Sequence, residues 1–524
     1  MSEEIKARDF RESGSIFRKT LLKGIFGLSR MGSSLLLDLI TILIFYIYFE
    51  YYGLDAMFTG IGTMLGKFAI SISGFLMGYL SDRFPPNKLG RRKPFLLVGA
   101  PLLGISFIML FIPYMLLPAN PSNIDLFCWL TGWIVVFNVA YGTLIVPYQS
   151  MLPETFGERD RFGASLSENA FNFGGTIISL ILFVDFETKF SEWRALDVLP
   201  DETFTETIII VGLIVIVFYV PALILIPISA EDAMAACIAK GKTSPAIKAT
   251  KSLSQAIKGD IFQAIVNKNY VKFIFFIGIS EVGVFMAISA LAGYIDNVFN
   301  YTGDDFLVVG LAVGLASLGS TCLWWWMSKK RFNIHKTLVV GYLVLVVTMP
   351  FSLVIGLTQE NAVLQSAIFF GGLLAGLDCD YFLQYVMLGN IVEEDEHRTG
   401  KSRSGLYHGL LDAPENFFQG LAMFLLGFIL SIPDVSVGGK SFSGGYYWWG
   451  PVAAVFIILG LLVFRGIKAD LGAIIEANKS GGIATSISIF TNRHPDIKGV
   501  RGVFARVKDF FRDAGKFVKF LFEK

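Results

Sequence analysis

Long apolar runs alternate with short charged segments along the whole of this 524-residue chain. A helix of about 20 mainly apolar residues is long enough to cross the hydrocarbon core of a bilayer. The pattern therefore predicts twelve membrane-spanning helices, at 22–52, 57–81, 94–117, 125–152, 162–185, 207–229, 270–299, 305–328, 337–357, 362–391, 404–432 and 446–466. We expect an all-α, multi-pass membrane protein.

The segment between the sixth and seventh runs is polar and contains several lysines, so it is too hydrophilic to span a membrane. It divides the chain into two six-helix halves, an arrangement typical of secondary transporters with a central binding site. The predicted parts are an N-terminal segment (1–21), an N-terminal bundle (22–229), a linker (230–269), a C-terminal bundle (270–466) and a basic tail (467–524).

The positions of lysine and arginine predict how the chain is oriented, because these residues accumulate in cytoplasmic loops. With the N-terminus inside, all but five of the 44 Lys and Arg residues lie in cytoplasmic segments. The five exceptions are Lys189, Arg194 and Lys440 in outer loops and Arg30 and Lys67 within helices. We therefore expect both termini, the linker and the tail to be cytoplasmic.

The tail has a helical pattern of its own. Between residues 500 and 521, valine, leucine and phenylalanine recur at helical spacing, and lysine and arginine stand between them. This pattern predicts a basic amphipathic helix on the inner leaflet. The alternative is a solvated tail that docks on the cytoplasmic loops.

Composition excludes several other classes of protein. The chain is 54% hydrophobic and only 17% charged, whereas soluble domains carry about 25% charge. A net charge of +1 provides no basic excess for nucleic acid. The four cysteines, Cys128, Cys237, Cys322 and Cys379, lie far apart and have no metal-ligand spacing. We expect no resident cofactor. The sequence also shows no spacing of a nucleophile and a general base that would indicate an enzyme.

The loop after the second run carries a recognisable motif. Gly78, Asp82 and Arg83 are followed by Gly90, then by the basic residues Arg91, Arg92 and Lys93. This segment resembles the loop 2–3 signature of the major facilitator superfamily, with an insertion at 84–89. An Asp at a helix end can pair with Arg, so Asp82, Arg83, Arg91 and Arg92 are candidate gating residues. The alternative is ordinary cytoplasmic positive charge.

Two further segments narrow the resemblance. The fourth run ends in Val-Pro-Tyr-Gln-Ser-Met-Leu-Pro-Glu at 146–154, and an acidic and basic segment at 394–409 follows the tenth run. Both resemble the glycoside–pentoside–hexuronide:cation symporters, including the melibiose-type and sucrose-transporter-type members. The resemblance implies the alternating-access fold, the cell membrane and, more loosely, a sugar substrate.

The chain differs from that family at charged positions. Two Asp of the sodium-coupled melibiose-type members correspond to Ile70 and Gly74, and a third corresponds to Ile145. A helix 5 Arg of the family corresponds to Glu168, and a helix 11 Lys lies near Glu415. We therefore do not expect a sodium site of the melibiose type.

More than three residues from either end of a predicted span, the spans contain seven carboxylates and only two cations. Carboxyl groups removed from water hold protons more readily, and charges inside membrane helices mark functional positions by default. The predicted proton-coupling residues are Asp38, Glu168, Glu281, Asp380, Asp412 and Glu415. Alternatively, these groups are paired structural carboxylates or lie in an aqueous vestibule.

A sugar site needs polar groups that bind hydroxyls beside aromatic faces. The predicted substrate-binding residues are Ser34, Asp38, Asn138, Tyr141, Gln149, Asn172, Tyr381, Gln384 and Tyr385. Each could instead hold helices together by hydrogen bonds.

These observations favour a secondary transporter that moves a sugar or glycoside together with protons, with the lipid bilayer and a small solute as its partners. One alternative is a uniporter or exporter of another organic solute on the same fold. Another is a membrane sensor or lipid-handling protein without coupled transport.

Overall fold

The computed structural model describes residues 16–85, 89–118, 120–156, 158–227, 267–299, 303–327, 334–354, 362–399, 404–437, 440–465 and 467. Among these residues, eleven helices are long and apolar enough to cross a membrane. The tail from residue 468, with its predicted amphipathic helix, lies outside the described residues, as does the linker except for 267–269.

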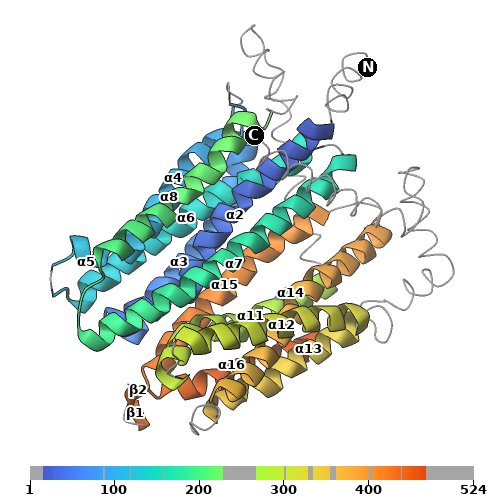
Figure 1. The fold of residues 1–524 in the computed structure, drawn as a ribbon. Coiled ribbons are helices and arrows are strands. Elements are labelled where there is room, and N and C mark those ends of the chain that lie inside the picture. Colours follow the sequence, from blue (N-terminus) through green and yellow to red (C-terminus); the bar gives the residue numbers. More distant parts are fainter. Residues whose placement is uncertain are drawn as a thin grey trace, which may run out of the picture. The chain divides into compact units, whose positions relative to one another are not determined.

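The six predicted spans of the first half are all helical (Figure 1). The elements are α2 (Ile16–Tyr46), its π-helical continuation η1 (Ile47–Tyr51), α3 (Ala56–Arg83), α4 (Lys93–Phe111), α5 (Pro113–Leu116), α6 (Asn123–Thr155), α7 (Glu158–Leu196) and α8 (Glu202–Leu225). α4 ends before the predicted residue 117 because Pro113 has no N–H to continue the helix. α7 extends beyond the predicted residue 185, and its polar extension includes a Lys189–Asp185 ion pair one turn apart.

The second half repeats this plan. Its elements are α11 (Lys268–Tyr294), the π-helical η2 (Ile295–Phe299), α12 (Gly303–Trp326), α13 (Ile334–Thr348), the 3-10 turn η4 (Met349–Leu353), α14 (Ala362–Thr399), α15 (Ser404–Leu430) and α16 (Gly445–Phe464). α12 lies at the predicted eighth span but is not one of the eleven helices that are long and apolar enough to cross a membrane. The count of twelve spans therefore stays a prediction.

One element was not expected. Between α15 and α16 the chain forms an antiparallel hairpin of β1 (Asp434–Val437) and β2 (Lys440–Ser443), with Asp434 opposite Ser443. The Ser443 hydroxyl donates to the Leu430 carbonyl at 2.7 Å, which ties the hairpin to the end of α15. A four-residue strand is too short for its alternating pattern to stand out between two apolar spans.

Polar side chains define where several helices begin. Asp55 accepts hydrogen bonds from the backbone N–H groups of Met57 and Phe58 at the start of α3. Ser122 and Asp125 form a reciprocal capping box at the start of α6. These caps satisfy N–H groups that have no partner within the helix, at the ends that we predict to lie outside the cell.

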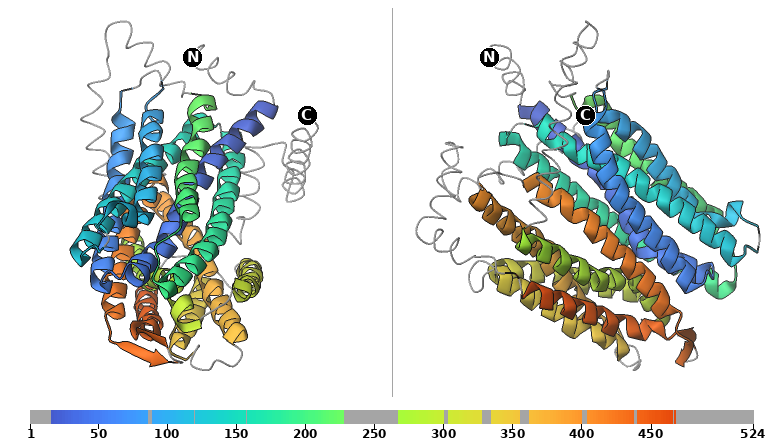
Figure 2. Two further views of the ribbon diagram at one scale, coloured as in Figure 1. Left: turned by 60° about the vertical axis from the view of Figure 1, so that its left-hand side comes forward. Right: turned by 180° about the vertical axis from the view of Figure 1, so that it is seen from behind.

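The helices pack in long neighbouring pairs, as two further views show (Figure 2). In the first half α2 packs along α7, and α4 packs along α6 and α8. In the second half α11 packs along α15 and α16. The α3–α15 pair joins the halves, and glycines allow it: a Cβ on Gly427 would lie 2.5 Å from the Ala56 carbonyl oxygen and 3.0 Å from the Gly60 Cα.

The described chain belongs to two compact units. The first comprises residues 1–389 and 403–467 and therefore holds both predicted bundles apart from the end of α14. The second comprises residues 390–402 and 468–524, of which the structure describes 390–399, the last turns of α14.

The α4–α8 contact gives a test of the packing. A Cβ on Gly104 would collide with the backbone carbonyl oxygen of Gly212, and such overpacking costs about 1–3 kcal/mol. We expect Gly104→Ala to lower the Tm of the purified protein by several degrees. Gly132→Ala is the matched control, because a Cβ there meets nothing within 4 Å, and an unchanged Tm in both variants would contradict the close approach.

Candidate functional site

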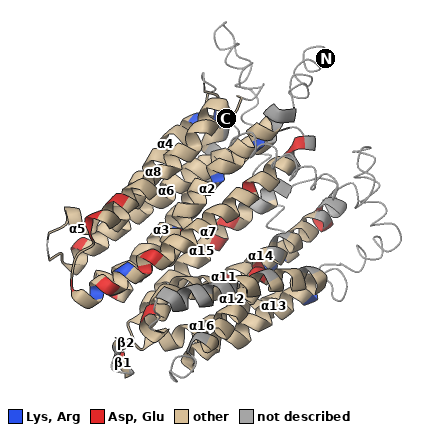
Figure 3. Cartoon of the chain, viewed as in Figure 1, with Lys and Arg blue, Asp and Glu red and all other residues tan. Residues whose placement is uncertain are grey.

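Charged residues are sparse along the middle of the described helices (Figure 3). The polar groups within the bundle gather in three sets. The arginine cluster consists of Arg30, Ser34, Asp38, Tyr141, Glu168, Asn172 and Thr176. The lysine cluster consists of Lys67, Glu281, Tyr342, Asp380, Asp412, Glu415 and Gln419. The outer network consists of Tyr46, Glu50, Ser191, Arg194, Asp296, Asn297 and Tyr446.

The arginine cluster lies between α2 and α7. Residues four apart share one face of a helix, so Ser34 and Asp38 both face α7, which packs along α2. The Ser34 hydroxyl donates to the side-chain oxygen of Asn172, and the Thr176 hydroxyl donates to the Asp38 carboxylate at 2.7 Å. The structure thus brings together three of the predicted substrate-binding residues, Ser34, Asp38 and Asn172.

Arg30 provides the positive charge of this cluster. Its Nη1 donates to the hydroxyl of Tyr141 on α6 at 3.1 Å. Glu168 on α7 also interacts electrostatically with the guanidinium group. The predicted residues Tyr141 and Glu168 therefore both lie around Arg30, so the cluster combines one cation with the two carboxylates of Asp38 and Glu168.

The lysine cluster joins the two halves. Lys67 on α3 donates from Nζ to the side-chain oxygen of Gln419 on α15 at 3.0 Å. The amide nitrogen of Gln419 donates in turn to Glu281 on α11 at 3.1 Å. The Lys67 ammonium group also lies 4.1 Å from the ring centroid of Phe285, a cation–π distance. One amide therefore links a cation of the first half to a carboxylate of the second.

Further carboxylates lie around this link. Glu415 interacts electrostatically with Glu281, Asp380, Asp412 and Lys67, so four of the six predicted proton-coupling residues lie in one place. Asp380 accepts a hydrogen bond from the Tyr342 hydroxyl. Carboxylates thus outnumber the ammonium group in this cluster.

Asp378 and Asp380 point in different directions, as helical geometry requires of residues two apart. Asp378 accepts hydrogen bonds from Ser317 and Ser320 of α12, both at 2.7 Å. Asp380 instead faces Tyr342 on α13. Asp378 therefore belongs to a contact between helices and not to the lysine cluster.

Tyr381 connects the two clusters. Its side chain is 72% exposed, yet its electrostatic neighbours are Glu281, Glu415, Asp380 and, from the first half, Asp38. An exposed ring among carboxylates of both halves borders accessible space. This is the place where a solute could contact the polar groups of both halves.

Other predicted residues lie apart from this space or outside the described side chains. Asn138 donates to the Ile134 carbonyl of its own helix and lines a cavity of about 20 Å³ beside Lys67. Gln149 is exposed on α6, whereas Gln384 is buried and its amide nitrogen has no hydrogen-bond partner among the described residues. The side chains of Asp82, Arg83 and Tyr385 lie outside the described part of the chain.

The predicted gating residues Arg91 and Arg92 precede α4. Arg92 makes a two-pronged ion pair with Glu154 at the end of α6, at 2.6 and 2.9 Å. Glu154 belongs to the Pro-Tyr segment noted in the sequence, so two motifs far apart in the chain meet here. The predicted partner, Asp82, is not described, and its pairing stays a prediction.

The outer network was missed from the sequence. Arg194 of α7 contacts Glu50 at 2.6 Å, Asp296 at 3.2 Å and Asn297 at 3.1 Å. The hydroxyl of Tyr446 on α16 donates to Glu50 at 2.7 Å. Additional hydrogen bonds to Asp296 come from Ser191 and Tyr46. These contacts join the two halves at the ends that we predict to lie outside the cell.

The sequence predicts an outer loop at Arg194 because the polar extension of α7 hides its helical character. A signal was present nonetheless. The first helix of each half ends in a π-helical segment with an acidic residue, Glu50 in η1 and Asp296 in η2. Such π-helical segments are often found at functional sites. An acidic residue at the end of the first helix of each half could therefore have indicated a cation shared by the two residues.

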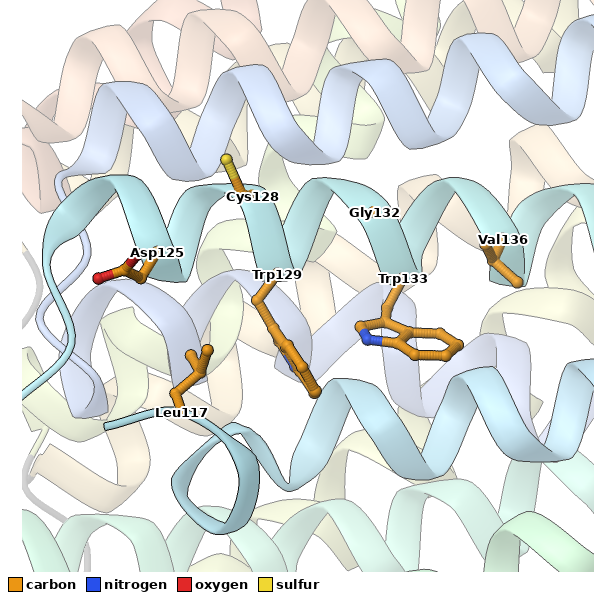
Figure 4. Close-up of a pocket in the computed structure, with 7 residues that line it drawn as sticks. All are labelled: Leu117, Asp125, Cys128, Trp129, Gly132, Trp133 and Val136. Atoms are coloured by element: carbon orange, nitrogen blue, oxygen red, sulfur yellow. The ribbon is translucent and has the colours of Figure 1, made fainter. Parts of the chain in front are cut away.

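A surface groove of about 490 Å³ lies at the outer end of α6 (Figure 4). Trp129 and Trp133 project from the same side of α6, and Leu117 lies opposite Trp129. The one carboxylate of its lining, Asp125, already accepts hydrogen bonds from the capping residue Ser122. The groove is therefore mostly apolar and separate from the charged clusters.

Comparison with known proteins gives consistent results. The profile of a family described as MFS/sugar transport protein matches residues 25–464. An uncharacterized symporter of Synechocystis sp. is 23% identical over 527 aligned residues, which cover 84% of this chain and 94% of the relative.

Solved structures show the same fold. A bacterial homologue of the human lysosomal transporter Spinster, inward-facing and unoccupied, has a TM-score of 0.60 at 14% identity, covering 88% of this chain and 99% of that one. A D-xylose–proton symporter has a TM-score of 0.55 at 16% identity, covering 87% and 99%. At these identities the likeness establishes the fold.

The arginine cluster yields a stability prediction. Tyr141→Phe removes the one side-chain hydrogen bond that Arg30 makes among the described residues, and a hydrogen bond to a charged group contributes about 1.5–3 kcal/mol. We expect a lower Tm for the purified protein. Tyr381→Phe is the matched control, because within the described part of the chain its hydroxyl has no hydrogen-bond partner. Equal Tm values for both variants would contradict the role of Tyr141.

Proposed function

This chain belongs to the MFS/sugar transport protein family, and we propose that it carries a sugar or glycoside together with protons across the cell membrane by alternating access. It is a multi-pass membrane transporter of small solutes with the major facilitator fold, not a member of an enzyme family. The coupling ion and the solute class are the proposed part.

The observation that carries proton coupling is the charge imbalance of the lysine cluster. Glu281 and Glu415 interact with the ammonium group of Lys67, and Asp380 and Asp412 interact in turn with these carboxylates. Away from bulk water a carboxylate without a counter-ion is costly, and binding a proton removes the charge. Successive gain and loss of protons here would change the attraction between Lys67 on the first half and the carboxylates on the second.

A sugar or glycoside fits the groups around Tyr381. Asp38, Ser34 and Asn172 offer oxygen and nitrogen atoms that can exchange hydrogen bonds with hydroxyl groups. The exposed ring of Tyr381 offers an apolar face near Asp38, which suits the mixed polar and apolar surface of a sugar ring. These residues come from both halves, as a site with alternating access requires.

We propose that the outer network is the outer gate, closed in this structure. It joins η1, α7, η2 and α16 through contacts of Arg194 and Tyr446. Opening the outer end requires these contacts to break. The inner gate is proposed at Asp82, Arg83, Arg91 and Arg92, with Arg92 already fixed to the first half by Glu154.

Transport by vesicles tests the proposed function. With the inner compartment more alkaline, we expect saturable uptake of one member of a labelled sugar panel, with accumulation lost when the pH gradient is collapsed. A difference of about one pH unit corresponds to about 1.4 kcal/mol per proton, or about tenfold accumulation. Asp412→Asn and Glu415→Gln should abolish accumulation but retain sugar counterflow.

Asp185→Asn is the control for these variants, because Asp185 is an exposed carboxylate that pairs with Lys189 on the same helix. Saturable uptake that ignores the pH gradient would contradict proton coupling. The absence of exchange for every sugar in the panel would contradict the proposed substrate class.

The outer gate makes a separate prediction. In a variant without the four native cysteines, Thr41→Cys should be protected from an impermeant thiol reagent added outside the cell. Adding Arg194→Ala should raise the labelling rate about tenfold, because it leaves the carboxylates of Glu50 and Asp296 without their shared partner, and losing a hydrogen bond to a charged group costs about 1.5–3 kcal/mol, which destabilises the closed state.

Lys189→Ala is the matched control for the gate, since Lys189 lies on the same helix but forms only an exposed pair with Asp185. An equal rise in labelling from Lys189→Ala, or no rise from Arg194→Ala, would show that Arg194 does not hold the outer end closed.

A further inference from the structure

Lys67 has the surroundings of a bound cation. Its Nζ contacts the side-chain oxygen of Gln419 at 3.0 Å and the face of the Phe285 ring at 4.1 Å. Glu281 and Glu415 both interact electrostatically with the ammonium group. An amide oxygen, nearby carboxylates and an aromatic face are the partners that a positive ion selects in a low-dielectric interior.

Gln419 is held in the orientation that presents its oxygen to the cation. Its amide nitrogen donates to Glu281 at 3.1 Å, and a carboxylate accepts only from N–H or O–H donors. The side-chain oxygen is therefore left for Lys67. Because Gln419 lies on α15 and Glu281 on α11, two helices of the second half jointly form the negative side of the site.

A small cavity adjoins the first half of the same site. It has a volume of about 20 Å³. Its lining contains Lys67, Phe285 and the polar residues Thr41, Thr63 and Asn138, together with five apolar residues, Leu37, Ile40, Ile44, Ile134 and Met423. This volume is close to that of one water-sized probe. The first half thus provides three polar residues to the lining beside Lys67, one each from α2, α3 and α6.

We propose that the Lys67 ammonium group is a covalently attached occupant of a monovalent-cation site, so that shortening this side chain opens the site to Na⁺. The oxygen ligands are Gln419 and Glu281 from the second half and Thr41, Thr63 and Asn138 from the first. Lysine carries its charge as a compact point at the end of a flexible side chain. The side chain of Lys67 fills the space that a free ion would need.

This inference extends the proposed symport, and what it implies for transport rests on that proposed function. A symporter with its own cation in the site needs no Na⁺ to draw the two halves together at this level. It would then respond to protons on the surrounding carboxylates. The test measures ion binding by purified protein without sugar, so its failure is distinguishable from failure of proton-coupled transport.

The experiment compares wild-type protein with Lys67→Ala in sodium chloride and in choline chloride at equal concentrations. We expect the Tm of Lys67→Ala to rise saturably with Na⁺, by about 2 °C when Na⁺ is about tenfold above its dissociation constant. The wild-type Tm should be the same in both salts. Retained ²²Na⁺ on the variant, and not on the wild type, provides the second measurement.

Three variants assign the response to this site. Lys67→Arg keeps a fixed cation and should not respond to Na⁺. Lys67→Ala combined with Glu281→Gln removes a carboxylate ligand and should lose the Na⁺ response. Lys23→Ala, which removes a cation that pairs with Asp160, is the matched control and should behave as the wild type.

If Lys67→Ala is monodisperse after purification in sodium chloride but aggregates in choline chloride, Na⁺ replaces the missing ammonium group and the proposal is supported. The same Tm of Lys67→Ala in both salts would overturn it. Aggregation of Lys67→Ala in both salts would also overturn the proposal, because Na⁺ would then not occupy the vacated site. A Na⁺ response of the wild type that Glu281→Gln removes would overturn it as well.

Discussion

The cost of an unneutralised charge away from water governs the arrangement of this protein. A charge at the centre of a bilayer costs about 2.5–3.5 kcal/mol on insertion scales. Each of the three polar sets meets this constraint in a different way. Arg194 is shared by Glu50 and Asp296 of different halves, Arg30 is held by Tyr141 beside Glu168, and Lys67 lies among carboxylates that outnumber it.

The same constraint holds the two halves together. At the end predicted to lie outside, Arg194 makes polar contacts between the halves. At mid-helix, Lys67 and Ser71 make them. The Ser71 hydroxyl donates to the Ala413 carbonyl at 2.8 Å. Stacking of Phe68 on Phe417 adds an apolar contact at the same level. Because α3 provides all three mid-helix contacts, one helix face both carries the cation and packs against α15. Changes in charge at the lysine cluster are therefore coupled directly to the contact between the halves.

Much of the candidate site follows from helical spacing within single segments. Ser34 and Asp38 share a face of α2, and Asp378 and Asp380 diverge, because side-chain directions repeat with the period of the helix. The spacing did not indicate which face of which other helix lies opposite. From the sequence, Lys67 is only a cation within a predicted helix, whereas packing of α3 against α15 places it beside Gln419. The partners of Arg194 do not follow from helical spacing either, because they lie more than a hundred residues away in the chain.

The sequence by itself determined the membrane class, the positions of eleven apolar helices and the family, because a bilayer requires long apolar runs and the symporter motifs are local. It also showed that acids exceed cations inside the membrane. Only the tertiary structure decided which charges meet, since this depends on how each helix is rotated and on which helices are neighbours. The outer network and the contact of Lys67 with Gln419 are products of that packing. Charge content is a property of the chain, whereas charge pairing is a property of the fold.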